Sequence, residues 1–286
     1  MKFLNPPLSN LKPEYIFELC VNGFSDEDKK SKLLSCKQLV ETDSKNYQKL
    51  IPKKIDSFCK SDLPANVTSK EMKSVYDRKF AAADSDGRKY YNTIISQAEH
   101  GICPICGIRM VSTLDHYLPK AKVPTLVVTP SNLIPACRDC NMDKKADMVL
   151  DPKQTPVHLY FDRLPDDIWL YVTVGSNMEI QYYISCPDTW DDSLRCRVEK
   201  HLETYNLHTL YSSHAATEIA DKQLQWRELQ RIGSDSDIFK DIHGMRISTE
   251  ARDLNSWKAA LYRGLEQEFD KVKNWLLSNS ASSSNT

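Results

Sequence analysis

The sequence has 286 residues, of which 41% are hydrophobic and 27% are charged, and its 38 basic and 39 acidic side chains leave a formal net charge of −1. This balance is typical of a folded globular chain with a sizeable core, and it excludes disorder by composition. It also excludes a strongly positive field over the whole molecule, although the first 150 residues are mildly basic and the rest is acidic.

Hydropathy and cysteine content indicate the compartment. No run approaches 18 apolar residues, so the sequence predicts no transmembrane helix and no membrane partner. The first residues, MKFLNPPLSNLKPEY, meet prolines at once, and we expect no secretory signal. The nine cysteines are an odd number, which favours thiols in a reducing cytoplasm over a disulfide framework.

The first hundred residues predict a series of short helices. Thr68 and Glu71 have the spacing of a capping box, which predicts a helix from there to about Ala83. A turn follows at 84–87, and apolar residues at helical spacing continue to Gly101.

The next fifty residues contain turns, prolines and two short β-like runs. These runs are Ile108 to Leu114 and Leu126 to Thr129, and a short helix is predicted from Asn141. Two longer β-rich runs, 168–174 and 178–185, flank a turn and predict a β-hairpin.

The chain beyond Trp190 is expected to be helical, with an apolar stripe near its end. The stripe recurs every three or four residues and consists of Leu261, Leu265, Phe269, Val272 and Leu276. We expect it mainly to be core, with a docking face for a partner as the alternative. Gly264 interrupts it and weakens the helix by up to about 1 kcal/mol unless something packs closely against it.

These features predict an α+β fold that is mostly helical and has four parts. The parts are a helical N-terminal region (1–100), a small core rich in cysteines and turns (101–150), a β-hairpin with a helical C-terminal region (151–278) and a disordered tail (279–286).

Four cysteines form two CxxC pairs, and 30 residues separate the pairs. Each pair can aim two thiolates at one ion, and four thiolates complete the tetrahedral set of a structural Zn²⁺. Unrelated buried thiols and a CxxC redox motif are the alternatives, but a redox motif would not need the second pair. The predicted zinc ligands are Cys103, Cys106, Cys137 and Cys140.

Polar residues interleave with these cysteines. The sequence reads LDHYLPK at 114–120, NLIPACRDCN at 132–141 and then a lysine at 144. Over about residues 101–145 it resembles the HNH endonucleases, whose ββα-metal site consists of two strands and a helix around one divalent cation. The last histidine of the family name is replaced here by Asn141, which gives an HNN variant.

The resemblance implies that His116 is the general base of phosphodiester hydrolysis. A histidine whose pKa lies near 6.5 can take a proton from water at neutral pH, whereas a lone histidine is more often structural. The resemblance also implies that Asp115 and Asn141 hold a catalytic Mg²⁺ or Mn²⁺, which prefer oxygen ligands and act as Lewis acids. Asn132 would hold the loop or orient His116.

Two lysines and the geometry of a strand are also part of the expected nuclease site. Lys120 and Lys144 are predicted to contact neighbouring phosphates. Because consecutive strand residues point to opposite faces, Asp115 and His116 are expected at the end of a strand, where the zinc site holds the geometry.

Two downstream segments, 160–165 and 201–207, resemble the PtuB-like nuclease subunit of Septu-type anti-phage systems, which also accompanies some retrons. This resemblance implies a defence role with a partner ATPase (PtuA-like) and, in retrons, a reverse transcriptase with its noncoding RNA. DNA is the favoured substrate, and RNA including tRNA is the alternative. A non-catalytic zinc module that binds nucleic acid or protein, and a nuclease that acts alone, are the competing interpretations.

Overall fold

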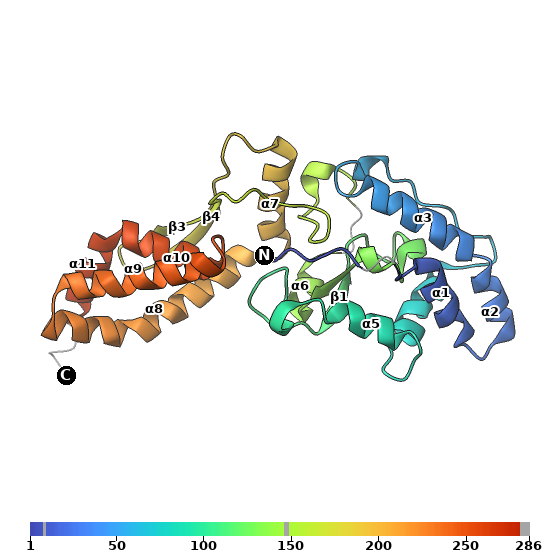
Figure 1. Ribbon diagram of the computed structural model, residues 1–286, viewed down its shortest axis with the longest axis horizontal. Helices are drawn as coiled ribbons and strands as arrows, with labels where there is room; N and C mark the ends of the chain where they lie inside the picture. The colour runs from blue at the N-terminus through green and yellow to red at the C-terminus, as the bar shows by residue number, and fades with distance from the viewer. Residues whose placement is uncertain (8–9, 146–148, 281–286) are drawn as a thin grey trace. The chain divides into compact units, whose positions relative to one another are not determined.

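The structure is a computed structural model that describes residues 1–7, 10–145 and 149–280. Its contacts divide the chain into two compact units, 1–163 and 164–286 (Figure 1). Across the described residues the fold is mostly helical with two separate two-stranded antiparallel sheets, which confirms the predicted α+β class. No described helix combines the length and apolar content needed to cross a bilayer.

The first unit contains both the N-terminal helices and the cysteine-rich segment, and the finer division at residues 100 and 150 stays a prediction. The tail predicted for 279–286 lies outside the described residues from 281 on. The elements of this unit are α1 (Pro13–Asn22), α2 (Glu27–Leu34), α3 (Lys37–Leu50), η1 (Ile55–Ser57), α4 (Ser69–Val75), η2 (Tyr76–Phe80), α5 (Arg88–Ile95), η3 (Glu99–Gly101), β1 (Thr113–His116), η4 (Pro124–Leu126), η5 (Pro130–Asn132), β2 (Leu133–Ala136), α6 (Arg138–Asp143) and η6 (Pro152–Gln154).

A single hydrophobic cluster joins the N-terminal helices to the segment that carries the sequence motif. Phe17 of α1 and Phe80 of η2 are buried in the same cluster as Leu114 of β1, Val127 and Leu133 of β2. Burial of such side chains is the main favourable term in folding. The N-terminal helices therefore share one hydrophobic core with the segment that carries the motif.

The predicted helix at Thr68 begins as expected. Thr68 accepts from the backbone N–H of Glu71, whose carboxylate accepts from the Thr68 N–H, so the capping box is present. At Tyr76 the helix widens into a π-turn, η2, in which the Ala81 N–H donates to the Tyr76 carbonyl at 2.8 Å. This turn ends at Phe80, three residues before the predicted helix end.

The antiparallel pair β1 and β2 is displaced from the two β-like runs predicted for this region, because β1 overlaps only the end of the first run and β2 begins four residues after the second. Thr113 pairs with Ala136 and His116 with Leu133. The run 126–129 is buried and lies between two short 3₁₀ turns that begin at prolines. The second strand is hidden in the sequence because it contains Pro135, which only an edge strand tolerates. In Figure 1, α6 lies beside β1, and the two elements are in contact.

The second unit is a hairpin covered by helices, as predicted. Its elements are β3 (Leu170–Val174), β4 (Ile180–Ile184), α7 (Asp192–Thr204), α8 (Leu207–Ile232), α9 (Asp235–Arg252), α10 (Trp257–Gln267) and α11 (Phe269–Ser280). The strands pair antiparallel from Leu170 opposite Ile184 to Val174 opposite Ile180.

The C-terminal apolar stripe is core, and it spans two helices. Leu261 and Leu265 of α10 and Val272 and Leu276 of α11 are fully buried. Phe269, the fifth residue of the stripe, is partly exposed at the start of α11. The four buried side chains are core, so they do not form a docking face for a partner. A Cβ placed on Gly264 would lie 2.2 Å from Cγ2 of Val172, so this glycine permits the close packing that the sequence analysis required.

Candidate functional site

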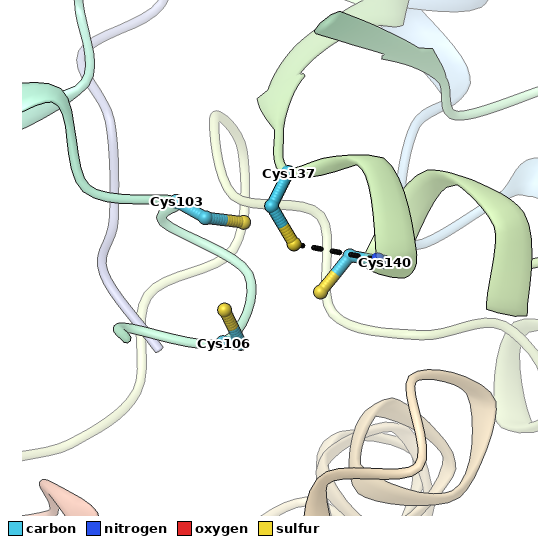
Figure 2. A group of neighbouring side chains, drawn as sticks. All are labelled: Cys103, Cys106, Cys137 and Cys140. Atoms are coloured by element: carbon cyan, nitrogen blue, oxygen red, sulfur yellow. Dashed lines mark hydrogen bonds between the residues drawn. The ribbon is translucent and has the colours of Figure 1, made fainter. Parts of the chain in front are cut away.

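The four predicted zinc ligands lie together (Figure 2). Their ligand atoms all lie within 4.8 Å of one another, and all four side chains are buried. Zn–S bonds of about 2.3 Å in a tetrahedron place sulfurs about 3.8 Å apart, so the cluster fits one Zn²⁺. The sulfurs come from Cys103, Cys106, Cys137 and Cys140.

Local structure explains why these sulfurs converge. The Gly107 N–H donates to the Cys103 carbonyl at 2.8 Å, and Gly107 has φ +70°, which glycine adopts without strain. In the second pair, Cys137 caps α6 and accepts from the Cys140 N–H at 3.4 Å. Hydrogen bonds among the four thiols lower the pKa of Cys106 and Cys137 and raise the pKa of Cys103 and Cys140.

Asp115 lies at the end of β1, where its carboxylate accepts a hydrogen bond from Lys144. The Lys144 Nζ lies 2.7 Å from Asp115 Oδ2 and 2.5 Å from the His116 carbonyl oxygen. Burial lowers the pKa of Lys144, and the Asp115 carboxylate acts in the opposite direction. The ammonium predicted to contact phosphate therefore neutralises Asp115.

The His116 side chain leaves β1 toward different neighbours. Its Nε2 lies 2.9 Å from the carbonyl oxygen of Val127. Because a carbonyl only accepts, Nε2 carries the proton and the neutral imidazole keeps its lone pair on Nδ1. Burial lowers the pKa of His116 to about 3, although the hydrogen bond to Val127 acts in the opposite direction, and Lys120 and Lys144 lower it further. The ring is therefore neutral at pH 7, and it is a weaker base than the unperturbed histidine that the sequence analysis assumed.

Asn132 is fully buried and clamps the loop that follows β1. Its Oδ1 accepts from the Leu118 N–H at 2.7 Å, and its Nδ2 donates to the Leu118 carbonyl at 3.0 Å. These contacts correspond to the loop-holding role predicted for Asn132. They act on the backbone two residues after His116.

The other two predicted residues lie on α6 and in the loop after β1. Asn141 lies on α6, which begins at Arg138 instead of Asn141 and packs against β1. Lys120 lies in the loop after β1, with its Nζ 2.6 Å from Oδ1 of Asp77.

Sequence reasoning did not find Tyr76 of η2. Its ring contacts the His116 ring edge-on, with centroids 4.5 Å apart, and its hydroxyl lies 3.4 Å from the Leu114 carbonyl oxygen. Burial raises the pKa of Tyr76, so its hydroxyl stays a donor. Only its place within a helical pattern was visible in the sequence.

A second unpredicted support comes from α3. The buried Asp43 carboxylate accepts from the Thr125 hydroxyl at 2.5 Å and from the Ser61 N–H at 2.9 Å. Ser44 and Thr129 share a buried hydroxyl hydrogen bond of 2.7 Å. These contacts hold the 125–129 segment, which carries the Val127 carbonyl that binds His116.

Comparison with known proteins agrees with this geometry. Residues 103–147 match the family described as HNH endonuclease. These residues form an HNH endonuclease domain. The chain is also 28% identical to Protein ea31 of Escherichia phage lambda over 225 residues, which cover 72% of this chain and 74% of that protein. No solved structure matches the chain.

Within the HNH domain, β1, β2 and α6 follow one another in the ββα order. The zinc cluster joins the loop before β1 to the start of α6. The oxygen donors of Asp115 and Asn141 have the chemistry that a hard divalent cation prefers. The four sulfur donors form one cluster, whereas the Asp115 carboxylate is paired with the Lys144 ammonium.

Proposed function

We propose that this protein is a metal-dependent endonuclease that hydrolyses phosphodiester bonds in nucleic acid. The observation that carries the proposal is the match of residues 103–147 to the HNH endonucleases. It is supported by the position of Asp115 and His116 at the end of β1, directly beside α6. DNA is the favoured substrate, with RNA including tRNA as the alternative.

The chemistry assigned to His116 follows from its hydrogen bond. With Nε2 donating to the Val127 carbonyl, Nδ1 accepts the proton of a water whose oxygen attacks phosphorus. The P–O bond to the leaving oxygen then breaks, and that oxygen takes a proton from solvent. A Mg²⁺ or Mn²⁺ held by Asp115 and Asn141 would supply Lewis-acid stabilisation of the phosphate charge.

Cleavage of plasmid DNA and of total cellular RNA by the purified zinc-containing chain tests this function. We expect cutting that requires Mg²⁺ or Mn²⁺, that stops with chelator and that is lost in His116→Asn. His100→Asn is the matched control, since the same substitution falls on a side chain of the same unit that is 85% exposed. Cutting that His116→Asn leaves unchanged would contradict the assignment.

The competing function is a zinc module that binds nucleic acid or protein without cutting it. Such a module needs the four cysteines but has no use for Asp115, His116 and Asn141. Binding of either nucleic acid by a zinc-loaded chain that cuts neither, with or without the product of a neighbouring ATPase gene, would favour this function over the nuclease.

We further propose that the nuclease is the effector of an anti-phage defence system and acts in the cytoplasm with a partner ATPase, or in a retron with a reverse transcriptase and its noncoding RNA. The resemblance of 160–165 and 201–207 to PtuB-like subunits supports this. In the structure, Tyr160, His201 and Leu202 are buried, so the resemblance concerns residues that pack the core. Phage plating on cells that carry the gene with its neighbours, or with His116→Asn, tests the role, and equal plaque numbers would contradict it.

A further inference from the structure

The π-turn η2 belongs to the N-terminal helical region, but its first two side chains contact the HNH domain. Tyr76 is buried against His116, and its neighbour Asp77 binds Lys120. Lys120 also lies over the Tyr76 ring, with its Nζ 4.4 Å from the ring centroid. One turn therefore contacts both the predicted base and a predicted phosphate contact.

A π-turn is an uncommon way to end a helix, and π-turns frequently occur at functional sites. Here the turn begins with Tyr76 and Asp77, and both side chains contact Lys120. The Tyr76 hydroxyl is directed at the Leu114 carbonyl of β1, two residues before His116. The Tyr76 ring and the Tyr76 hydroxyl therefore contact two residues at the end of β1, His116 and Leu114.

The next helix holds the π-turn firmly. A Cβ on Gly87 would lie 2.3 Å from the Lys79 carbonyl oxygen and 2.9 Å from the Phe80 Cα, so only glycine permits this approach. Arg88 donates from Nη1 to the Ala81 carbonyl at 2.5 Å, directly after the turn. Close packing by Gly87 and the hydrogen bond from Arg88 therefore hold the backbone of η2 in place.

We propose that η2 is a wall of the nuclease site, in which Tyr76 positions the His116 imidazole and Asp77 positions the Lys120 ammonium against a substrate phosphate. The inference rests on the proposed nuclease function. Tyr76 and Asp77 are positioning residues, since they act through His116 and Lys120. This also assigns a function to the N-terminal helical region, which contacts His116 and Lys120 through this turn.

The two positions have different kinetic signatures. Misplacement of a reacting group by about 1 Å costs roughly 100-fold in rate, so we expect Tyr76→Leu to lower kcat by about that factor. Tyr76→Phe keeps the ring and should retain most of kcat. Asp77→Asn releases Lys120 and should raise KM several-fold at nearly constant kcat. Combined with Lys120→Ala, it should add no further loss.

Two matched controls separate positioning from folding. Tyr91→Leu removes an aromatic ring from the same core cluster, where Tyr91 packs on Phe80 with centroids 6.0 Å apart. Asp84→Asn repeats the carboxylate substitution on the exposed loop after η2. The proposal is overturned if Tyr91→Leu lowers kcat as much as Tyr76→Leu, or if Asp77→Asn and Asp84→Asn have the same KM.

A readout without activity distinguishes this inference from the nuclease function itself. In a chain with isotope-labelled histidine, the ring-proton resonances of His116, assigned with His116→Asn, report the Tyr76 ring above them. We expect them to move in Tyr76→Leu and to stay in place in Tyr76→Phe and Tyr91→Leu. If the wild-type chain cuts neither substrate, with or without the product of the neighbouring ATPase gene, the nuclease proposal fails. Unmoved His116 resonances in Tyr76→Leu would reject the positioning contact independently.

Discussion

The ammonium of Lys144 lies 2.7 Å from Oδ2 of Asp115, and the two side chains are only 9% and 8% exposed. Lys144 is the C-terminal cap of α6, and Asp115 lies in β1. The same ammonium donates to the His116 carbonyl. This ion pair therefore joins the helix and the strand of the ββα domain at the point where the proposed catalytic residues lie.

Loss of the Lys144 ammonium is expected to destabilise the first unit. Removing one partner of a buried ion pair leaves an uncompensated charge and costs about 3–5 kcal/mol. We expect Lys144→Met to lower the free energy of unfolding in urea by that amount. Lys145→Met, the same substitution on the adjacent exposed lysine, should change it little. Equal stability of the two variants would show that Asp115 does not depend on Lys144.

Removal of zinc is expected to unfold the HNH domain. Structural zinc contributes its binding free energy to folding, so Cys140→Ala should lose both the metal and cooperative unfolding of the first unit. Elemental analysis should find one zinc per wild-type chain. Cys59→Ala is the control because Cys59 is exposed and lies apart from the cluster. A zinc-free chain that unfolds like the wild type would contradict the structural role.

Substitution of the two asparagines of the motif is expected to change different properties, the stability for Asn132 and the metal affinity for Asn141. Asn132→Ala removes both hydrogen bonds to the Leu118 backbone and leaves buried polar groups unpaired, which costs about 1–3 kcal/mol each. Asn141→Ala should leave the free energy of unfolding nearly unchanged, but weaken Mn²⁺ binding measured by calorimetry. The reverse pattern would exchange the roles assigned to the two residues.

Features that depend on local spacing were predicted correctly from the sequence. The cysteines come together because each CxxC pair is one turn, and Gly107 permits the left-handed backbone that the first turn needs. The capping box at Thr68 is equally local. The hairpin β3–β4 follows from two β-rich runs around a short turn.

Features that depend on tertiary packing were not predicted. Pro135 concealed β2, because its place at the edge of a two-stranded sheet cannot be inferred from neighbouring residues. Tyr76 was assigned only to a helix, since its contact with His116 depends on how η2 packs on β1. The sequence analysis assigned Lys144 to a phosphate. Its burial beside Asp115 could not be predicted, because that burial depends on the contact between α6 and β1.

Packing at Gly264 gives a prediction for the second unit. A methyl group there would lie 2.2 Å from Cγ2 of Val172 on β3, and such overpacking costs about 1–3 kcal/mol. We therefore expect Gly264→Ala to lower the unfolding temperature of the second unit. Gly244→Ala is the matched control, since it lies in α9 and its Cβ would have no neighbour within 4 Å. There the higher helix propensity of alanine should stabilise the helix by up to about 1 kcal/mol. If α10 packs on β3 as observed, calorimetry should find a lower unfolding temperature for Gly264→Ala and a higher one for Gly244→Ala. A higher unfolding temperature in both variants would show that this contact is not close.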